Sequence, residues 1–135
     1  MSAFFDTNLF VYAVSRSPED REKRLTAGAL IAEGGFSLSV QVIQEFIHTC
    51  VRKGRLGQSP EAIHATAEFL FTFPCAFPSR EMVLRALALQ GRYQVSYWDA
   101  AILSAAQELG CDTLFTEDLN PGQDYDGIRV VNPFP

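Results

Sequence analysis

The sequence predicts an α/β fold with a central parallel sheet flanked by helices. Short apolar runs alternate with helical segments along the chain, as in strands joined by helical crossovers. Serine-proline pairs and glycines mark where several of these helices start and stop. Two of the apolar runs end in acidic residues, and in a parallel sheet such ends open on the same edge.

The composition favours a single domain over residues 1–135. Hydrophobic residues make up 47% of the chain, which is too many for a disordered protein. No apolar run reaches about 18 residues, so no membrane span is predicted. Only Ser2 and Ala3 separate Met1 from the first predicted strand, which leaves no room for a secretory signal. We therefore expect a cytoplasmic protein.

The three cysteines, Cys50, Cys75 and Cys111, are odd in number and lack CxxC spacing. Neither a zinc site nor a disulfide framework is indicated, and we expect buried thiols in a reducing compartment. The net charge is −5 and the sequence pI is about 4.9. Acidity argues against binding nucleic acid through charge alone, but it is compatible with an enzyme whose carboxylates hold metal ions.

The first half of the chain contains two predicted units of strand and helix. We expect a strand at 3–5, a short helix or turn at 8–15, a helix at 17–33, a strand at 36–39 and a helix at 40–53. One face of the 17–33 helix carries Leu25, Ala29 and Ala32.

The second half is predicted to be mainly helical. Helices are expected at 59–72, 79–91 and 97–109, and strands at 113–115 and 128–131. Pro74 interrupts the run at 73–77, which is at best a short edge strand. No repeat, low-complexity tract or linker is present.

The run Asp6-Thr7-Asn8 directly follows the first strand. All three residue types cap helices well, so a helix cap is the simplest interpretation. The carboxyl end of a parallel strand is also where open α/β sheets bind ligands, so Asp6 is equally a candidate site residue.

Three further acids have both a structural and a functional interpretation. Glu45 lies in the middle of a helix, where a solvated glutamate is ordinary. Asp99 fits a capping box with Ser96, yet its apolar neighbours suggest a partly buried carboxylate that needs a partner or a cation. Asp118 and its neighbour Glu117 follow the 113–115 strand, and only one of the two can easily face the crevice beside Asp6.

If Asp6, Glu45, Asp99 and Asp118 converge, they form a pocket of oxygen ligands. Four carboxylates at close range could not all stay ionised without cations. Oxygen ligands suit Mg²⁺ or Mn²⁺ rather than zinc or copper. Such a site fits phosphate-ester hydrolysis, with the metal activating water and stabilising charge on the phosphate.

These four acids match a known family. The chain resembles the PIN-domain ribonucleases, and within them the VapC-type toxins of prokaryotic toxin–antitoxin pairs. The matching segments are Phe-Phe-Asp-Thr-Asn around Asp6, Val-Ile-Gln-Glu-Phe around Glu45, Ser-Tyr-Trp-Asp-Ala around Asp99, and Leu-Phe-Thr-Glu-Asp-Leu around Asp118. Each segment alone is a weak signal, but four in order over the whole chain are a strong one.

The resemblance implies a PIN-like three-layer α/β/α sandwich with a central parallel sheet. It also implies an Mg²⁺- or Mn²⁺-dependent endoribonuclease that hydrolyses RNA phosphodiester bonds, leaving a 5′-phosphate and a 3′-hydroxyl. A small antitoxin encoded beside the gene would inhibit it, and homodimers are expected. The four acids are then both the catalytic and the metal-binding residues, and Glu117 keeps the position of the fourth acid ambiguous.

Several other side chains are candidates for supporting roles. Asn8 and Thr116 could orient a carboxylate or the scissile phosphate. Arg52, Lys53 and Arg55 follow the Glu45 helix and are candidate RNA contacts, although cations at a helix end also suit its dipole.

Other functions remain open. A HAD-like phosphatase with Asp6 as nucleophile would need a second aspartate where Asn8 stands, and a receiver domain would need a lysine later than Lys53. A catalytically silent PIN-like domain that binds a partner is the main alternative.

Overall fold

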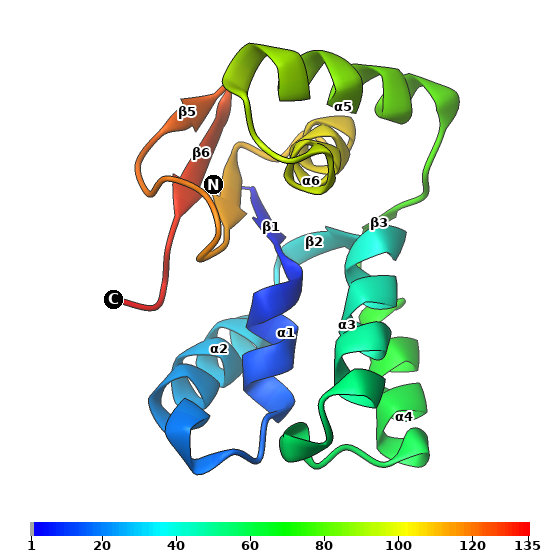
Figure 1. Ribbon diagram of the computed structural model, residues 1–135, viewed down its shortest axis with the longest axis vertical. Coiled ribbons are helices and arrows are strands. Elements are labelled where there is room, and N and C mark those ends of the chain that lie inside the picture. Colours follow the sequence, from blue (N-terminus) through cyan, green and yellow to red (C-terminus); the bar gives the residue numbers. More distant parts are fainter. Residues whose placement is uncertain (1) are drawn as a thin grey trace.

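The computed structural model describes residues 2–135 and contains a six-stranded sheet in the order β3-β2-β1-β4-β6-β5 (Figure 1). The strands are β1 (Ala3–Phe5), β2 (Phe36–Ser39), β3 (Cys75–Ala76), β4 (Thr113–Phe115), β5 (Asp124–Tyr125) and β6 (Ile128–Val131). All neighbouring pairs are parallel except β5 with β6, which is antiparallel. The predicted α/β fold with its PIN-like parallel sheet is confirmed, with one antiparallel strand at its edge.

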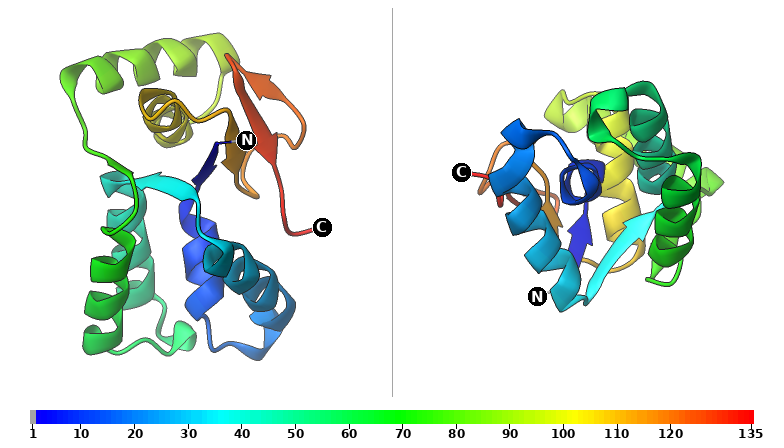
Figure 2. Two further views of the ribbon diagram at one scale, coloured as in Figure 1. Left: turned by 180° about the vertical axis from the view of Figure 1, so that it is seen from behind. Right: turned by 90° about the horizontal axis from the view of Figure 1, so that it is seen from below.

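Helices flank this sheet. They are α1 (Thr7–Val14), α2 (Arg21–Glu33), α3 (Val40–Arg52), α4 (Pro60–Leu70), α5 (Arg80–Tyr93) and α6 (Tyr97–Glu108), with two 3-10 turns, η1 (Pro18–Asp20) and η2 (Gly54–Leu56). Helix α1 packs on α2 and α3, α3 packs on α4, and α5 packs on α6. Figures 1 and 2 show α1 to α4 extending below the sheet, while α5 and α6 lie above it. None of these helices, within the described part of the chain, is long and apolar enough to cross a membrane.

The core explains why the short strands form. Phe4 and Phe5 of β1 are both buried, as expected for a central strand that is covered on both faces. The ring of Phe5 stacks on that of Phe36 from β2, with centroids 4.6 Å apart. Leu38 and Leu114, from the strands on either side of β1, are fully buried as well. This packing therefore holds the carboxyl ends of these strands, and the polar residues that follow them, in place.

Two sequence expectations are wrong in detail. The face of α2 that carries Leu25, Ala29 and Ala32 is exposed, and Leu25 is 59% accessible. The buried residue of this helix is Ala27, with Leu30 and Ile31 partly buried against the core. Of the three free cysteines, Cys75 is only partly buried, because it lies in the edge strand β3.

Candidate active site

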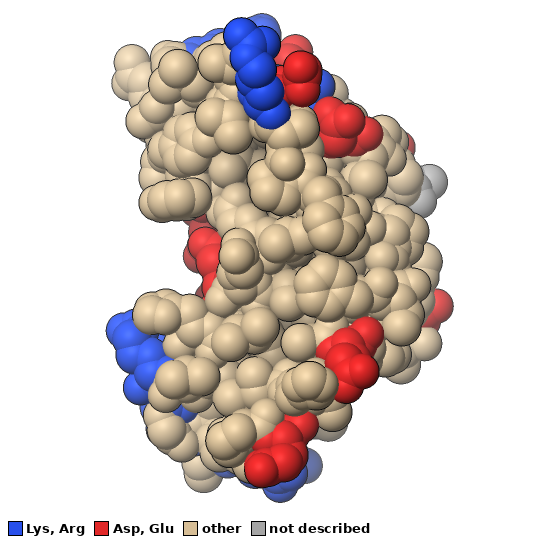
Figure 3. Space-filling view, turned by 90° about the vertical axis from the view of Figure 1, so that its right-hand side faces the viewer, with Lys and Arg blue, Asp and Glu red and all other residues tan. Residues whose placement is uncertain are grey.

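A pocket of about 610 Å³ opens at the carboxyl ends of β1 and β4. Its walls come from α1, α3, the first turn of α6 and the turn after β4. Figure 3 shows acidic side chains inside a hollow of the surface, with Lys or Arg side chains at the lower edge of that hollow. The residues that line it include Asp6, Thr7, Asn8, Tyr12, Gln41, Gln44, Glu45, His48, Thr49, Lys53, Arg55, Trp98, Asp99, Glu117 and Asp118.

Asp6 lies at the floor of this pocket and is only 6% exposed. It is also the N-cap of α1, so the helix-cap interpretation is confirmed for a residue that lines the pocket as well. Its Oδ1 accepts a 2.7 Å hydrogen bond from the Thr7 backbone N–H, and its Oδ2 accepts a 2.8 Å bond from the Thr116 hydroxyl. Burial raises the pKa of Asp6 to about 7; the two hydrogen bonds oppose this shift, and the nearby charges of Asp118 and Glu45 add to it.

The raised pKa of Asp6 predicts how the stability of the protein without bound metal depends on pH. The folded state holds the Asp6 proton more tightly than the unfolded chain, whose carboxyl has a pKa near 3.8. The free energy of unfolding should therefore fall as pH rises from about 4 to about 7, by on the order of 4 kcal/mol at about 1.4 kcal/mol per pKa unit. Urea unfolding in EDTA across this range measures the fall, and Asp6→Asn should remove most of it. An unchanged slope in that variant would contradict the assignment.

The turn after β4 is tied to the start of α1. The Thr116 hydroxyl accepts a 3.1 Å hydrogen bond from the Asp118 backbone N–H while it donates to Asp6. The Asn8 amide donates to Asp118 Oδ2 and to Thr116 Oγ1, both at 3.2 Å. Burial, followed by the charges of Asp99 and Glu117, raises the pKa of Asp118. Asn8 and Thr116 thus hold two carboxylates in place.

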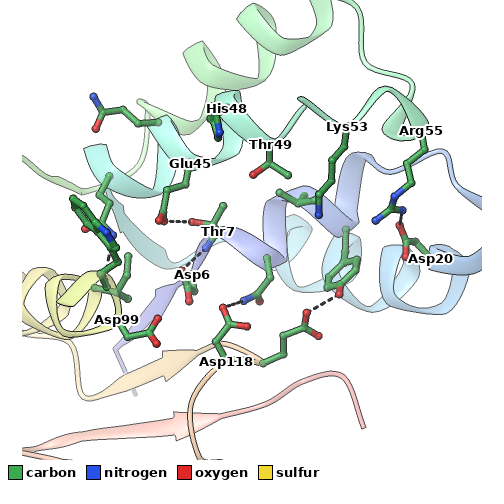
Figure 4. A pocket seen from close by; sticks show the side chains of 18 residues that line it. Asp6, Thr7, Asp20, Glu45, His48, Thr49, Lys53, Arg55, Asp99 and Asp118 are labelled. Atoms are coloured by element: carbon green, nitrogen blue, oxygen red, sulfur yellow. Dashed lines mark hydrogen bonds and ion pairs between the residues drawn. The ribbon is translucent and has the colours of Figure 1, made fainter. Parts of the chain in front are cut away.

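Glu117 engages a different set of side chains. Its carboxylate accepts a 2.6 Å hydrogen bond from the Tyr12 hydroxyl and forms a 3.1 Å ion pair with Lys23 of α2. Figure 4 shows Asp118 beside Asp6 and Asp99. The structure therefore gives the two neighbouring acids different partners, and Asp118 is the one that faces the buried carboxylate.

Glu45 and Asp99 reach the pocket from opposite walls (Figure 4). The Thr7 hydroxyl donates a 2.8 Å hydrogen bond to Glu45 Oε1, so α1 orients the acid of α3. Ser96 caps α6, because its hydroxyl accepts a 3.1 Å hydrogen bond from the Asp99 backbone N–H. Burial raises the pKa of Asp99, and its hydrogen bond with Ser96 opposes the shift.

The donor chemistry of the pocket fits a hard divalent cation. All four acids offer oxygen ligands, and the buried Asn8 Oδ1 has no hydrogen-bond partner within residues 2–135. In that same range, no three His, Cys, Asp or Glu side chains lie close enough to hold a metal ion as they stand. Hydrogen bonds from Thr7 to Glu45 and from Asn8 to Asp118 hold these two carboxylates where they stand.

The three candidate RNA contacts have different positions. Lys53 and Arg55 line the pocket, whereas Arg52 is exposed outside it. Arg55 forms ion pairs with Asp20 at 3.2 Å and Glu19 at 3.4 Å, so it joins η2 to η1. Lys53 is therefore the cation best placed to meet a phosphate at this rim.

Sequence reasoning missed several lining residues that helical spacing could have found. Tyr12 lies one turn beyond Asn8 on α1. Gln41 and Thr49 lie one turn before and one turn after Glu45 on α3, and Gln44 and His48 flank the same face. Polar residues repeated at this spacing line up on one side of a helix.

Solved structures with this fold include toxins of toxin–antitoxin systems. A toxin–antitoxin complex from Klebsiella pneumoniae matches with a TM-score of 0.69 and 24% identity, covering 98% of both chains. VapC20 of Mycobacterium tuberculosis, a toxin that cleaves the sarcin-ricin loop, matches with a TM-score of 0.69 and 20% identity over 87% of this chain and 92% of the other. VapBC2 of Rickettsia felis, bound to a promoter DNA fragment, matches with a TM-score of 0.65 and 18% identity over 96% and 97%.

Among curated protein sequences, no match to this chain is found. A family model does match, over residues 3–123, and it describes the PIN domain. The matched range includes β1, the four acids and the turn that holds Asp118. The chain therefore belongs to the PIN-domain family.

Proposed function

We propose that this protein is an Mg²⁺- or Mn²⁺-dependent endoribonuclease and the toxin of a type II toxin–antitoxin pair in the cytoplasm. The observation that carries the proposal is that Asp6, Glu45, Asp99 and Asp118 all line one pocket. PIN domains are typically nucleases that use divalent metals, and the structural neighbours are VapC toxins. Family membership also removes the basis for a HAD-like phosphatase.

Each side chain has a distinct task in this proposal. The four carboxylates would hold the cation, which when bound would make an attacking water more acidic and stabilise charge on the phosphate. Thr116 and the Thr7 backbone keep Asp6 in one orientation, and the Asn8 amide does the same for Asp118. Lys53 would contact an RNA phosphate at the rim. The products would be a 5′-phosphate and a 3′-hydroxyl.

The basic test is cleavage of total RNA by purified protein with Mn²⁺, and its loss in EDTA. The alternative of a silent binding domain has one observation in its favour, because the acids within residues 2–135 are not already gathered as a ligand set. Undetectable cleavage by protein that binds Mn²⁺ would support that alternative.

Glu117 and Asp118 should differ in their effect on cleavage. Asp118→Asn should reduce kcat about 100-fold or more, because it removes a ligand charge beside Asp6. Glu117→Gln should change kcat only a few-fold, because Glu117 pairs with Lys23 and Tyr12 instead. Single-turnover cleavage of one RNA by both variants measures this difference. The reverse pattern would transfer the ligand role to Glu117.

Lys53→Met should weaken RNA binding, with Arg52→Met as the matched control. Loss of one phosphate contact should raise KM a few-fold and lower the slope of log K against log salt by about 0.7. Arg52 lies outside the pocket and should leave this slope nearly unchanged. Equal effects of the two substitutions would show that Lys53 makes no special contact.

The proposed partners are a small antitoxin and a second copy of the chain. The Klebsiella and Rickettsia neighbours are toxin–antitoxin assemblies by name. Coexpression with the product of an adjacent short gene, followed by size-exclusion chromatography with light scattering, tests both partners. A toxin that stays monomeric and active beside that product would contradict the assignment.

A further inference from the structure

A second cavity adjoins the acidic pocket along the same edge of the sheet. It has a volume of about 170 Å³ and lies where β2 and β3 end, next to the β1 end that carries Asp6. Ser39 and Ala76, from the ends of those two strands, form part of its wall. The two cavities share three lining residues, Gln41, Gln44 and Trp98.

The shared wall carries groups suited to a flat heteroaromatic ligand. Trp98, the only tryptophan in the sequence, has 64% of its surface exposed. It directly precedes Asp99, a candidate metal ligand. Its ring meets Tyr97 edge to face, with centroids 5.3 Å apart, so the indole is supported from one side. Deeper in the cavity the lining is apolar, with Met82 of α5 and Ala105 of α6.

The glutamine side chains at the rim can form hydrogen bonds with the polar edge of a flat ring. Gln41 donates a 3.2 Å hydrogen bond to the Trp98 backbone carbonyl, which fixes its amide beside the indole. Gln44 is exposed one turn along the same helix. Glutamine amides offer both donors and acceptors, and nucleobases present both along their edges.

We propose that this cavity binds one unpaired nucleobase of the RNA substrate, stacked on Trp98. The inference rests on the proposed ribonuclease function, because it requires a phosphate at the acids. A nucleotide carries its base one sugar away from its phosphate, so a phosphate in the acidic pocket brings a base to the adjoining cavity. The site would thus favour single-stranded or looped RNA, whose bases are free to leave the stack.

Binding at Trp98 can be followed by tryptophan fluorescence, because Trp98 is the only tryptophan in the sequence. Wild-type protein in Ca²⁺, which should bind the acids but support little cleavage, is titrated with a short single-stranded RNA, and with copies that carry one abasic position at a time. We expect the RNA to quench the emission, and one abasic position to weaken binding about 5- to 100-fold. No quenching, or the same affinity for every abasic copy, would overturn the proposal. Quenching by the antitoxin but not by RNA would also overturn it and mark a protein-docking site.

Cleavage provides a second and independent measurement. Trp98→Ala should lower kcat/KM and flatten the preference among cleavage sites, whereas Trp98→Phe should retain that preference. Phe69→Ala is the matched control, because Phe69 is an exposed aromatic residue of α4 outside both cavities. An unchanged cleavage profile in Trp98→Ala would refute the base site even if the enzyme is active. If wild type cleaves no RNA with Mg²⁺ or Mn²⁺, the ribonuclease proposal fails, while quenching in Ca²⁺ that depends on one base would still support a nucleobase site.

Discussion

Asp6→Asn is expected to reduce RNA cleavage at least about 100-fold while the protein remains folded. The amide keeps the size of the carboxylate: its oxygen can accept the hydrogen bond from the Thr7 N–H, and its NH2 group can donate to the Thr116 hydroxyl in place of the bond that Asp6 accepts. It loses the negative charge that a cation requires. Cleavage of a defined RNA under single-turnover conditions measures the loss, and circular dichroism checks the fold.

The same substitution should stabilise the metal-free protein at neutral pH. Asp6 is buried next to Asp118 and Glu45, so its ionised form is unfavourable in the folded state. An amide carries no charge at any pH, and the melting temperature in EDTA at pH 7 should hold or rise. A variant that is inactive because it unfolds would show the opposite shift. Full activity in a folded Asp6→Asn protein would remove Asp6 from the site.

The sequence predicted most of the sheet because its central strands are local features. β1 and β4 are apolar triplets, each followed at once by a polar residue, and both were expected at the observed bounds. β5 was missed because two residues form a strand only through pairing with β6. Its signal was the pair Asp126-Gly127, where both residues have positive φ and close a tight hairpin.

Helix faces were less predictable than helix positions. The expected 17–33 helix ends at Glu33 as observed, although the 3-10 turn η1 replaces its first turn, and its apolar Leu25 faces outward. The small Ala27 is buried instead, since α2 packs closely against α1. In a weakly amphipathic helix, the packing of neighbouring elements decides which side faces the core. The spacing of apolar residues within the helix does not predict that packing.

The site shows the same division between local and long-range information. The position of Asp6 at a strand end and that of Asp99 in a capping box follow from adjacent residues. The different surroundings of Glu117 and Asp118 do not follow from adjacent residues. Tyr12 of α1 and Lys23 of α2 hold Glu117, and both lie more than 90 residues away from it in the chain.

Mn²⁺ is expected to raise the melting temperature by roughly 10 °C at a hundredfold excess over its Kd. The four acids line one pocket, and the charges of neighbouring acids help to raise the pKa values of Asp6 and Asp118. A divalent cation removes that repulsion, and it binds the folded pocket far better than the unfolded chain. Mg²⁺ should give a smaller rise at equal concentration, because it sheds its waters reluctantly and binds less tightly than Mn²⁺. Ca²⁺ should bind but support little cleavage, being larger and looser in its geometry.

A melting series with each metal measures these shifts beside RNA cleavage, and Asp99→Asn is the matched control. Asp99 lines the same pocket from the first turn of α6, and asparagine keeps the size and polarity of its side chain there. The variant should therefore melt near wild type in EDTA but show a much smaller rise with Mn²⁺ and little cleavage. An equal rise in both proteins would place the cation elsewhere. Cleavage that persists in excess EDTA would refute the metal mechanism, because four carboxylates alone cannot neutralise the charge of an attacked phosphate.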